Sequence, residues 1–249
     1  MPRQARKKSK SNIYHIMLRG INRQIIFEDS EDYTKFIETL DRYKAVSGYK
    51  VFAYCLMPNH IHMLIKADKE EPDLIVKRIS CSYVYWYNSK YYRSGHLFQD
   101  RFRSEPVETD EYFLTVLRYI HQNPINAKLV DNIGDYEFSS YNEYINGGSV
   151  VDKVLVLSGM GTDEFIKFNN KQNDDVCLDI EEQKFRLSDN DAKEVIKELS
   201  GCNNMSELQL LEITRRDECI KELRKHGLSI RQISRLTGIS KGVIEKIGR

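Results

Sequence analysis

The sequence predicts an α+β fold: a ferredoxin-like antiparallel sheet with helices on one face, followed by a small all-α domain resembling a helix-turn-helix. Over residues 11–130, strand-like segments rich in β-branched and aromatic residues alternate with segments of helical periodicity. Their order is strand, helix, strand, strand, helix, strand, helix. Apart from the last helix, this is the order of a split βαβ arrangement. Beyond residue 191 the periodicity is helical throughout, which predicts a separate domain.

Turn and capping signals define the first half of the α+β region. Residues 12–18 (NIYHIML) form the first expected strand. A helix should begin at Ser30, a candidate N-cap, and stop at Gly48, because glycine is favoured just after a helix C-terminus. The next two strands, residues 49–57 and 60–66, are separated by a Pro-Asn turn, which predicts a hairpin.

The second half should contain two more helices and one strand. A helix is expected from about Pro72 towards Tyr92, with tyrosines and a tryptophan crowded at its end. Residues 96–107 (HLFQDRFRSEPV) are typical of an edge strand. Thr109 should cap the third helix, and Pro124 should end or kink it because proline interrupts helical geometry.

The composition is that of a globular protein, with 41% hydrophobic and 30% charged residues. No apolar run approaches the ~20 residues of a membrane span. The N-terminal stretch is basic but lacks the apolar core of a signal peptide, so we expect a cytoplasmic protein without membrane partners. The five cysteines form no CxxC pair, which argues against a disulfide framework and a zinc finger.

The net charge of +1 conceals an uneven distribution. The net charge is +6 over residues 1–130, −9 over residues 131–194 and +6 over residues 214–249. Two basic regions around an acidic one suggest two polyanion-binding parts joined by a solvated connector, although ordinary surface charge would also produce this pattern. We therefore expect four segments: a basic arm at 1–10, an α+β domain at 11–145, an acidic connector at 146–190 and a helical domain at 191–249.

Near the C-terminus, two short helices are expected around a glycine-containing turn, Thr237-Gly238-Ile239. A helix-turn-helix places one helix in the major groove of duplex DNA, and the basic charge here favours that role over a plain helical bundle. In this interpretation Arg231 and Arg235 would contact phosphates and Lys241 would face the groove.

Two pairs of residues could form a reactive site. His60 and His62 lie two apart in a predicted strand, so both imidazoles should point to one face and could begin a metal site. On spacing alone, a structural role for the pair is favoured. Tyr119 and Asn123 lie four apart in the third helix and share a face. They offer a nucleophile and an amide oxygen, but a core tyrosine and a helix-ending asparagine are equally ordinary.

Three motifs together carry a resemblance to a known family. MPNHIHMLI (57–65), GHLFQDRFRS (95–104) and RYIHQNPINAKLV (118–130) resemble the REP-associated tyrosine transposases, which belong to the HUH single-tyrosine class. The resemblance covers roughly residues 10–145. It implies that the histidine pair binds Mg²⁺ or Mn²⁺, that the helix tyrosine attacks DNA and that an amide residue completes the metal site. By position these are His60, His62, Tyr119 and Asn123. Insertion-sequence relatives carry glutamine at the last position.

The resemblance further implies DNA transposition through a 5′-phosphotyrosine intermediate. The substrate would be single-stranded DNA with a hairpin near the cleavage site, and the protein would be a monomer or a homodimer. Independently, the basic arm, the tyrosine cluster and four arginines suit backbone contacts and base stacking. These arginines are Arg19, Arg23, Arg101 and Arg103.

Two other functions remain open. A non-catalytic, sequence-specific DNA-binding regulator could use the same fold without turnover. A relaxase or replication initiator would share the chemistry but usually has a larger domain. The presence of His60, His62 and Tyr119 together favours the enzyme over the regulator.

Overall fold

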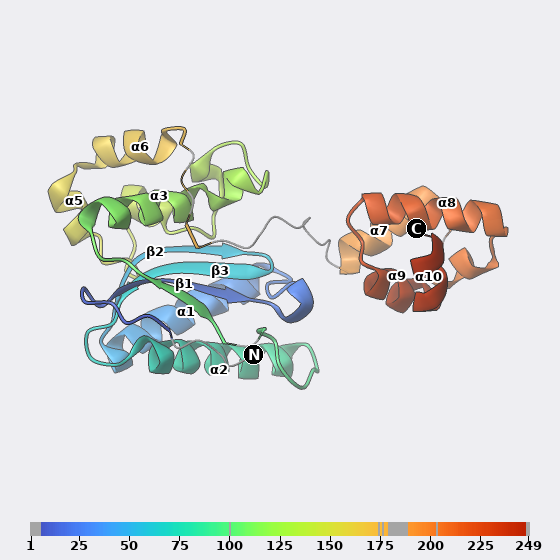
Figure 1. Cartoon of the computed structure of the whole chain (residues 1–249), viewed down its shortest axis with the longest axis horizontal. Coiled ribbons are helices and arrows are strands. Elements are labelled where there is room, and N and C mark those ends of the chain that lie inside the picture. The colour runs from blue at the N-terminus through green and yellow to red at the C-terminus, as the bar shows by residue number, and fades with distance from the viewer. Residues whose placement is uncertain are drawn as a thin grey trace. The chain divides into compact units, whose positions relative to one another are not determined.

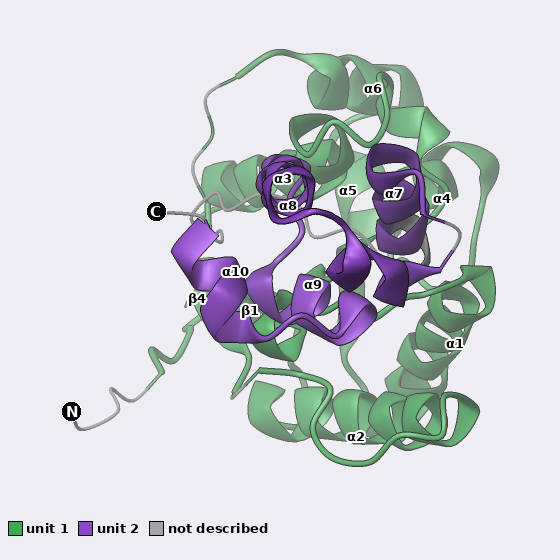
Figure 2. Cartoon of the chain, turned by 90° about the vertical axis from the view of Figure 1, so that its right-hand side faces the viewer, with its two compact units in different colours: residues 1–179 green, residues 180–249 purple. Residues whose placement is uncertain are grey.

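The structure is a computed structural model. It describes residues 6–99, 101–173, 175, 177–178, 189–202 and 204–247. The chain divides into two compact units, residues 1–179 and 180–249 (Figure 2). In the described part of the chain, no helix is both long and apolar enough to cross a membrane.

Unit 1 is built on a four-stranded antiparallel sheet in the order β2-β3-β1-β4. The central strands are β1 (Ile13–Arg19) and β3 (His60–Lys66). The hairpin predicted between residues 49 and 66 is present, with β2 (Lys50–Met57) paired to β3. The edge strand β4 is shorter than expected, spanning only Arg103–Pro106.

Helices cover both faces of this sheet (Figure 1). Helices α1 (Ser30–Ser47) and α2 (Pro72–Lys90) lie together on one face, as the ferredoxin-like order predicts. The additional helix, α3 (Asp110–Asn126), lies across the opposite face and packs on β2 and β3. The face that the split βαβ order alone leaves open is therefore partly covered by α3.

Most of the helix ends predicted from capping and stop residues are confirmed. The N-cap of α1 is Asp29 rather than Ser30, because Asp29 and Asp32 form a reciprocal capping box. Gly48 ends α1 in the left-handed conformation, at φ 64°, as expected. Thr109 caps α3 by accepting a hydrogen bond from the Tyr112 amide. Pro124 lies inside α3, which continues to Asn126, two residues further.

The connector predicted for 146–190 is wrong for its first part. Helices α4 (Tyr141–Asn146), α5 (Val154–Gly159) and α6 (Thr162–Asn170) belong to unit 1. The Phe165 side chain of α6 is fully buried in the core, and α6 packs on α3. Buried apolar side chains such as Phe165, Val151 and Val156 outweigh the acidic composition because they remove apolar surface from water. Residues 179–188 lie outside the described residues.

Unit 2 is all helical, as predicted, and has its own apolar core. Its described residues form four α-helices, and a short 3-10 helix at Met205–Leu210 lies between the first two. Ser229 caps α9 and Gly238 ends it in the left-handed conformation, at φ 78°. The α-helices are α7 (Asp189–Ser200), α8 (Ile213–Lys225), α9 (Ile230–Thr237) and α10 (Lys241–Ile247).

Candidate active site beneath helix α3

The sheet register gathers three histidines on the face that α3 covers. His60 and His62 of β3 share this face because strand side chains alternate. In the pairing of β1 with β3, Arg19 lies opposite His60 and Met17 opposite His62. The same alternation places His15, two residues before Met17, on the histidine face.

The three imidazoles are close together. The ring centroids of His60 and His62 are 5.1 Å apart, and those of His15 and His62 are 5.2 Å apart. His15 Nε2 is hydrogen-bonded to His62 Nδ1 at 2.9 Å. His60 Nδ1 is hydrogen-bonded to the side-chain oxygen of Asn59, in the hairpin turn, at 2.6 Å.

Helix α3 brings Tyr119 against this cluster. Its ring packs edge-on to His62, with centroids 5.8 Å apart, and to His15, with centroids 5.9 Å apart. Asn123 lies one turn further and is also buried. Its Nδ2 donates to the Tyr119 carbonyl at 2.9 Å, which leaves Oδ1 as the atom it can offer to a ligand. The structure thus brings Tyr119 against His62, whose neighbour on the same strand is His60, whereas Asn123 bonds within its own helix.

Burial keeps the site histidines neutral. It lowers the pKa of His60 to about 4, with a smaller effect from the Arg19 charge. It lowers the pKa of His62 well below the ordinary value, and His60 and His15 act in the same direction. A neutral imidazole carries a lone pair, so both side chains are in the state that a metal ion requires.

The residues present fit a divalent cation with few protein ligands. Among the described residues, no group of three or more His, Cys, Asp or Glu side chains could hold a metal, so the donors would be His60, His62 and Asn123. Within the same residues, His62 Nε2 is buried and has no hydrogen-bond partner. The Nδ1 of His60 is taken by Asn59, which leaves Nε2 for a ligand. Two imidazoles and one amide oxygen suit Mn²⁺ better than Mg²⁺.

Three of the arginines that were predicted to contact DNA line one pocket beside the histidines. A pocket of about 270 Å³ is lined by Met17, Arg19, Gln99, Arg101 and Arg103. Arg19 is the cross-strand neighbour of His60, so the positive charge borders the proposed metal ligands.

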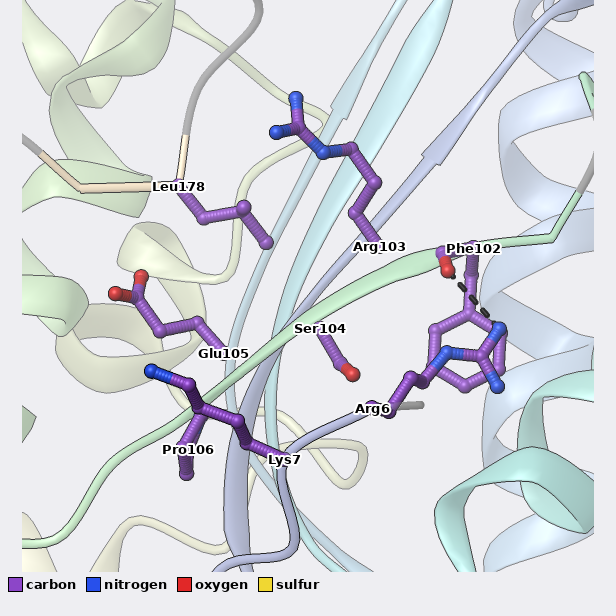
Figure 3. A pocket seen from close by; sticks show the side chains of 8 residues that line it. All are labelled: Arg6, Lys7, Phe102, Arg103, Ser104, Glu105, Pro106 and Leu178. Carbon is purple, nitrogen blue, oxygen red and sulfur yellow. Dashed lines mark hydrogen bonds between the residues drawn. The ribbon is translucent and has the colours of Figure 1, made fainter. Parts of the chain in front are cut away.

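A second hollow, of about 650 Å³, follows β4, and Arg103 also lines it (Figure 3). Here the N-terminal arm runs beside β4, with the guanidinium of Arg6 over the Phe102 ring. Arg6 pairs with Asp73, and Lys8 pairs with Glu71 at 2.9 Å. Part of the basic arm is therefore engaged by acidic side chains. Residues 1–5 lie outside the described residues.

The other predicted DNA contacts lie elsewhere. Arg23 is in the loop after β1, within a short 3-10 helix at Ile21–Arg23. Arg231 and Lys241 are exposed on unit 2. Arg235 is also exposed, but it forms an ion pair with Asp189 at 2.6 Å.

Sequence reasoning missed His15. Its signal was present, since His15 and Arg19 lie four apart in an apolar strand and must share a face. Nothing local indicates that this strand lies beside the one carrying His60 and His62. Strand order, a tertiary property, creates the contact.

Comparisons with known proteins show what this chain is similar to. Residues 8–123 match the family described as "Transposase IS200 like". A protein of Haemophilus influenzae described as a REP-associated tyrosine transposase is 24% identical over 106 residues, which is 38% of this chain and 60% of that relative. The match therefore spans less than two thirds of that relative's length.

One solved structure resembles the chain in fold. A REP-associated tyrosine transposase bound to a REP hairpin superposes with a TM-score of 0.50 at 16% identity, covering 61% of this chain and 94% of that one. A structure from Deinococcus radiodurans described as a transposase has a TM-score of 0.35 at 19% identity, covering 49% of this chain and 97% of that one.

The match to the IS200-like transposase family thus covers residues 8–123. The chain is also similar to the REP-associated tyrosine transposases, which confirms the resemblance carried by the three motifs.

Proposed function

We propose that unit 1 is a single-strand DNA endonuclease and strand transferase that acts in DNA transposition, with Tyr119 as its nucleophile. The observation that carries this proposal is the packing of the Tyr119 ring against His62, at 5.8 Å between centroids. In this proposal the hydroxyl of a helix tyrosine and a pair of neutral imidazoles on a strand would act on one reacting phosphate.

The reaction would be an in-line displacement at phosphorus. The Tyr119 hydroxyl loses its proton and its oxygen bonds to phosphorus. The bond to the 3′ oxygen breaks, and that oxygen leaves as a 3′-hydroxyl after taking up a proton. The product is a 5′-phosphotyrosine, and attack by a 3′-hydroxyl reverses the step, which makes the cycle covalent catalysis in two stages. Tyr119 is buried on the side of α3 that faces the sheet, which would keep bulk water from competing for the phosphotyrosine.

We propose Mg²⁺ or Mn²⁺ as the cofactor, held by His60, His62 and Asn123. Such a cation supplies charge neutralisation at a non-bridging phosphate oxygen. The orphaned His62 Nε2 supports this assignment, because a buried nitrogen lone pair without a partner is costly unless a ligand completes it.

Single-stranded DNA carrying a hairpin is the substrate we propose. One structural neighbour was solved bound to a REP hairpin. The pocket lined by Arg19, Arg101 and Arg103 borders His60 and would receive the phosphates that flank the scissile one. Guanidinium groups suit this role because they bind phosphate oxygens in a bidentate manner.

Unit 2 would add duplex recognition through its helix-turn-helix-like end. Arg231 and Lys241 are exposed there, on α9 and α10. They would contact phosphate and the major groove, respectively. Arg235, predicted to contact phosphate, is a weaker candidate because Asp189 neutralises it.

A cleavage assay tests the catalytic proposal. Single-stranded hairpin DNA labelled on its 3′ side is incubated with the protein and Mn²⁺, and denaturing gels separate covalent adducts. We expect an adduct that Tyr119→Phe abolishes. Tyr112→Phe, seven residues earlier on the same helix, is the matched control and should leave the adduct. An adduct that survives Tyr119→Phe contradicts the nucleophile. If wild-type protein forms none while still binding the DNA, the regulator is favoured.

A further inference from the structure

His15 is a buried histidine that neither the motifs nor the proposed reaction uses. It lies on β1 with no exposed surface, and its Nε2 is 2.9 Å from His62 Nδ1. Its other nitrogen, Nδ1, is buried and without a hydrogen-bond partner in the described structure. A fully buried imidazole with a single hydrogen bond destabilises the folded state, because its second nitrogen has lost water without gaining a partner. Such a residue in the core suggests a functional role.

The bond between the two histidines can be made in two ways. Either His62 donates from Nδ1–H to His15 Nε2, or His15 donates from Nε2–H to His62 Nδ1. A neutral imidazole has one N–H and one lone pair, so the first arrangement leaves a lone pair on His62 Nε2. The second places a proton there instead. Only the first leaves the buried His62 Nε2 able to bind a cation.

The neighbouring histidine indicates which arrangement the site uses. His60 Nδ1 bonds to the side-chain oxygen of Asn59, which can only accept. His60 is therefore the donor, and its lone pair is on Nε2. Histidines that bind metals commonly donate their second N–H to an acceptor in this way, and that acceptor sets the tautomer and the ring orientation. At His62 the corresponding acceptor is a nitrogen of His15.

We propose that His15 is a positioning residue: it accepts the Nδ1–H of His62 and thereby holds His62 in the tautomer whose Nε2 binds the cation. This rests on the proposed metal site. His15 acts through His62 and needs no contact with DNA. Its ring also packs edge-on to Tyr119, at 5.9 Å, so a substitute must keep an aromatic shape to isolate the hydrogen bond.

Binding of Mn²⁺ alone to the full-length, DNA-free protein tests the proposal without any activity measurement. The free-ion signal in electron paramagnetic resonance reports the bound fraction. His15→Phe keeps the ring but removes the acceptor, and its Mn²⁺ affinity should fall about 10- to 100-fold. His15→Gln retains an acceptor oxygen and should recover most of that loss.

Met17→Leu is the matched control. Met17 is on the same strand, buried, and directly opposite His62, but makes no hydrogen bond to it. This near-isosteric change should leave Mn²⁺ affinity unaltered. A loss equal to that of His15→Phe would mean that packing alone acts, and it would overturn the proposal.

A measurement on wild-type protein covers the case in which His15→Phe does not fold. With ¹⁵N-labelled histidine, two-bond proton–nitrogen spectra should show His62 protonated on Nδ1, with and without Mg²⁺. A proton on Nε2 overturns the inference, as does unchanged Mn²⁺ affinity in His15→Phe. Wild-type protein that binds no Mn²⁺ overturns it too, but by removing the proposed metal site rather than the role of His15.

Discussion

Unit 1 contains two buried histidines, His121 and His62, that differ in how many of their ring nitrogens have a hydrogen-bond partner. Both ring nitrogens of His121, on α3, are bonded: Nδ1 to Asn169 Oδ1 at 2.8 Å and Nε2 to Ser140 Oγ at 2.9 Å. His62, on the strand beneath, has one bonded nitrogen and one buried nitrogen without a partner in the described residues. The two residues are equally buried.

This difference distinguishes a histidine that stabilises the fold from one that is available to a ligand. The bonds of His121 join α3 to the segment that follows it, so this side chain stabilises the fold. The buried His62 nitrogen that has no hydrogen-bond partner in the described residues costs stability, and the proposed cation would offset that cost. We therefore expect substitution of His62 to affect mainly activity and substitution of His121 to affect mainly stability.

Replacing His62 should have the largest effect on activity. His62→Gln removes an imidazole donor from the proposed cation site, so adduct formation should fall about 10²- to 10³-fold, equivalent to several kcal/mol of transition-state stabilisation. Gel-based adduct rates measure the loss, and urea unfolding should show a much smaller change in stability. Equal losses in His121→Gln, measured on folded protein, would erase the distinction.

Replacing His121 should have the largest effect on stability. His121→Phe leaves the Asn169 and Ser140 side chains without their partner, so the free energy of unfolding should fall by about 2–4 kcal/mol. Urea titration followed by circular dichroism measures it. The double variant with Asn169→Ala should lose less than the sum of the two single changes, because they share one bond. Full additivity would argue against the network.

The burial of His121 should also make the stability of the protein depend on pH. Burial lowers the pKa of His121 to about 4, while the unfolded chain titrates near its ordinary value of 6.5. Below pH 6.5 the unfolded state takes up a proton that the folded state refuses, so stability is complete above 6.5 and declines as the pH falls towards 4. The part due to His121 is up to about 3 kcal/mol. Unfolding curves of His121→Phe should decline less steeply over this range, and parallel curves would refute the assignment.

The smallest effect concerns two exposed arginines on unit 2, Arg231 and Arg235, of which Arg235 forms an ion pair with Asp189. Arg231→Ala should weaken duplex DNA binding several-fold and reduce its salt dependence, because a phosphate contact is lost. Arg235→Ala should change it less, since Asp189 already neutralises that side chain. Fluorescence anisotropy over a range of salt concentrations measures both. A larger loss in Arg235→Ala would reverse the ranking.

Local patterns were sufficient to predict much of the fold. The hairpin that carries His60 and His62, the glycine stop at Gly48 and the shared face of Tyr119 and Asn123 depend on spacings of a few residues. Such features are encoded by neighbours in the chain. The same dependence on neighbours explains why the acidic segment after residue 146 does not reveal its helices: Phe165 is recognisable as a core residue only once α3 lies beside it.

By itself, the sequence determined which side chains each element offers: two histidines on a strand, a tyrosine on a helix and arginines nearby. Only the tertiary structure decided which of them meet. Placing β1 beside β3 brings His15 to His62, and laying α3 across that face brings Tyr119 to both. The physical reason is that strand order and helix placement minimise exposed apolar surface over the whole unit, a sum that no short segment contains.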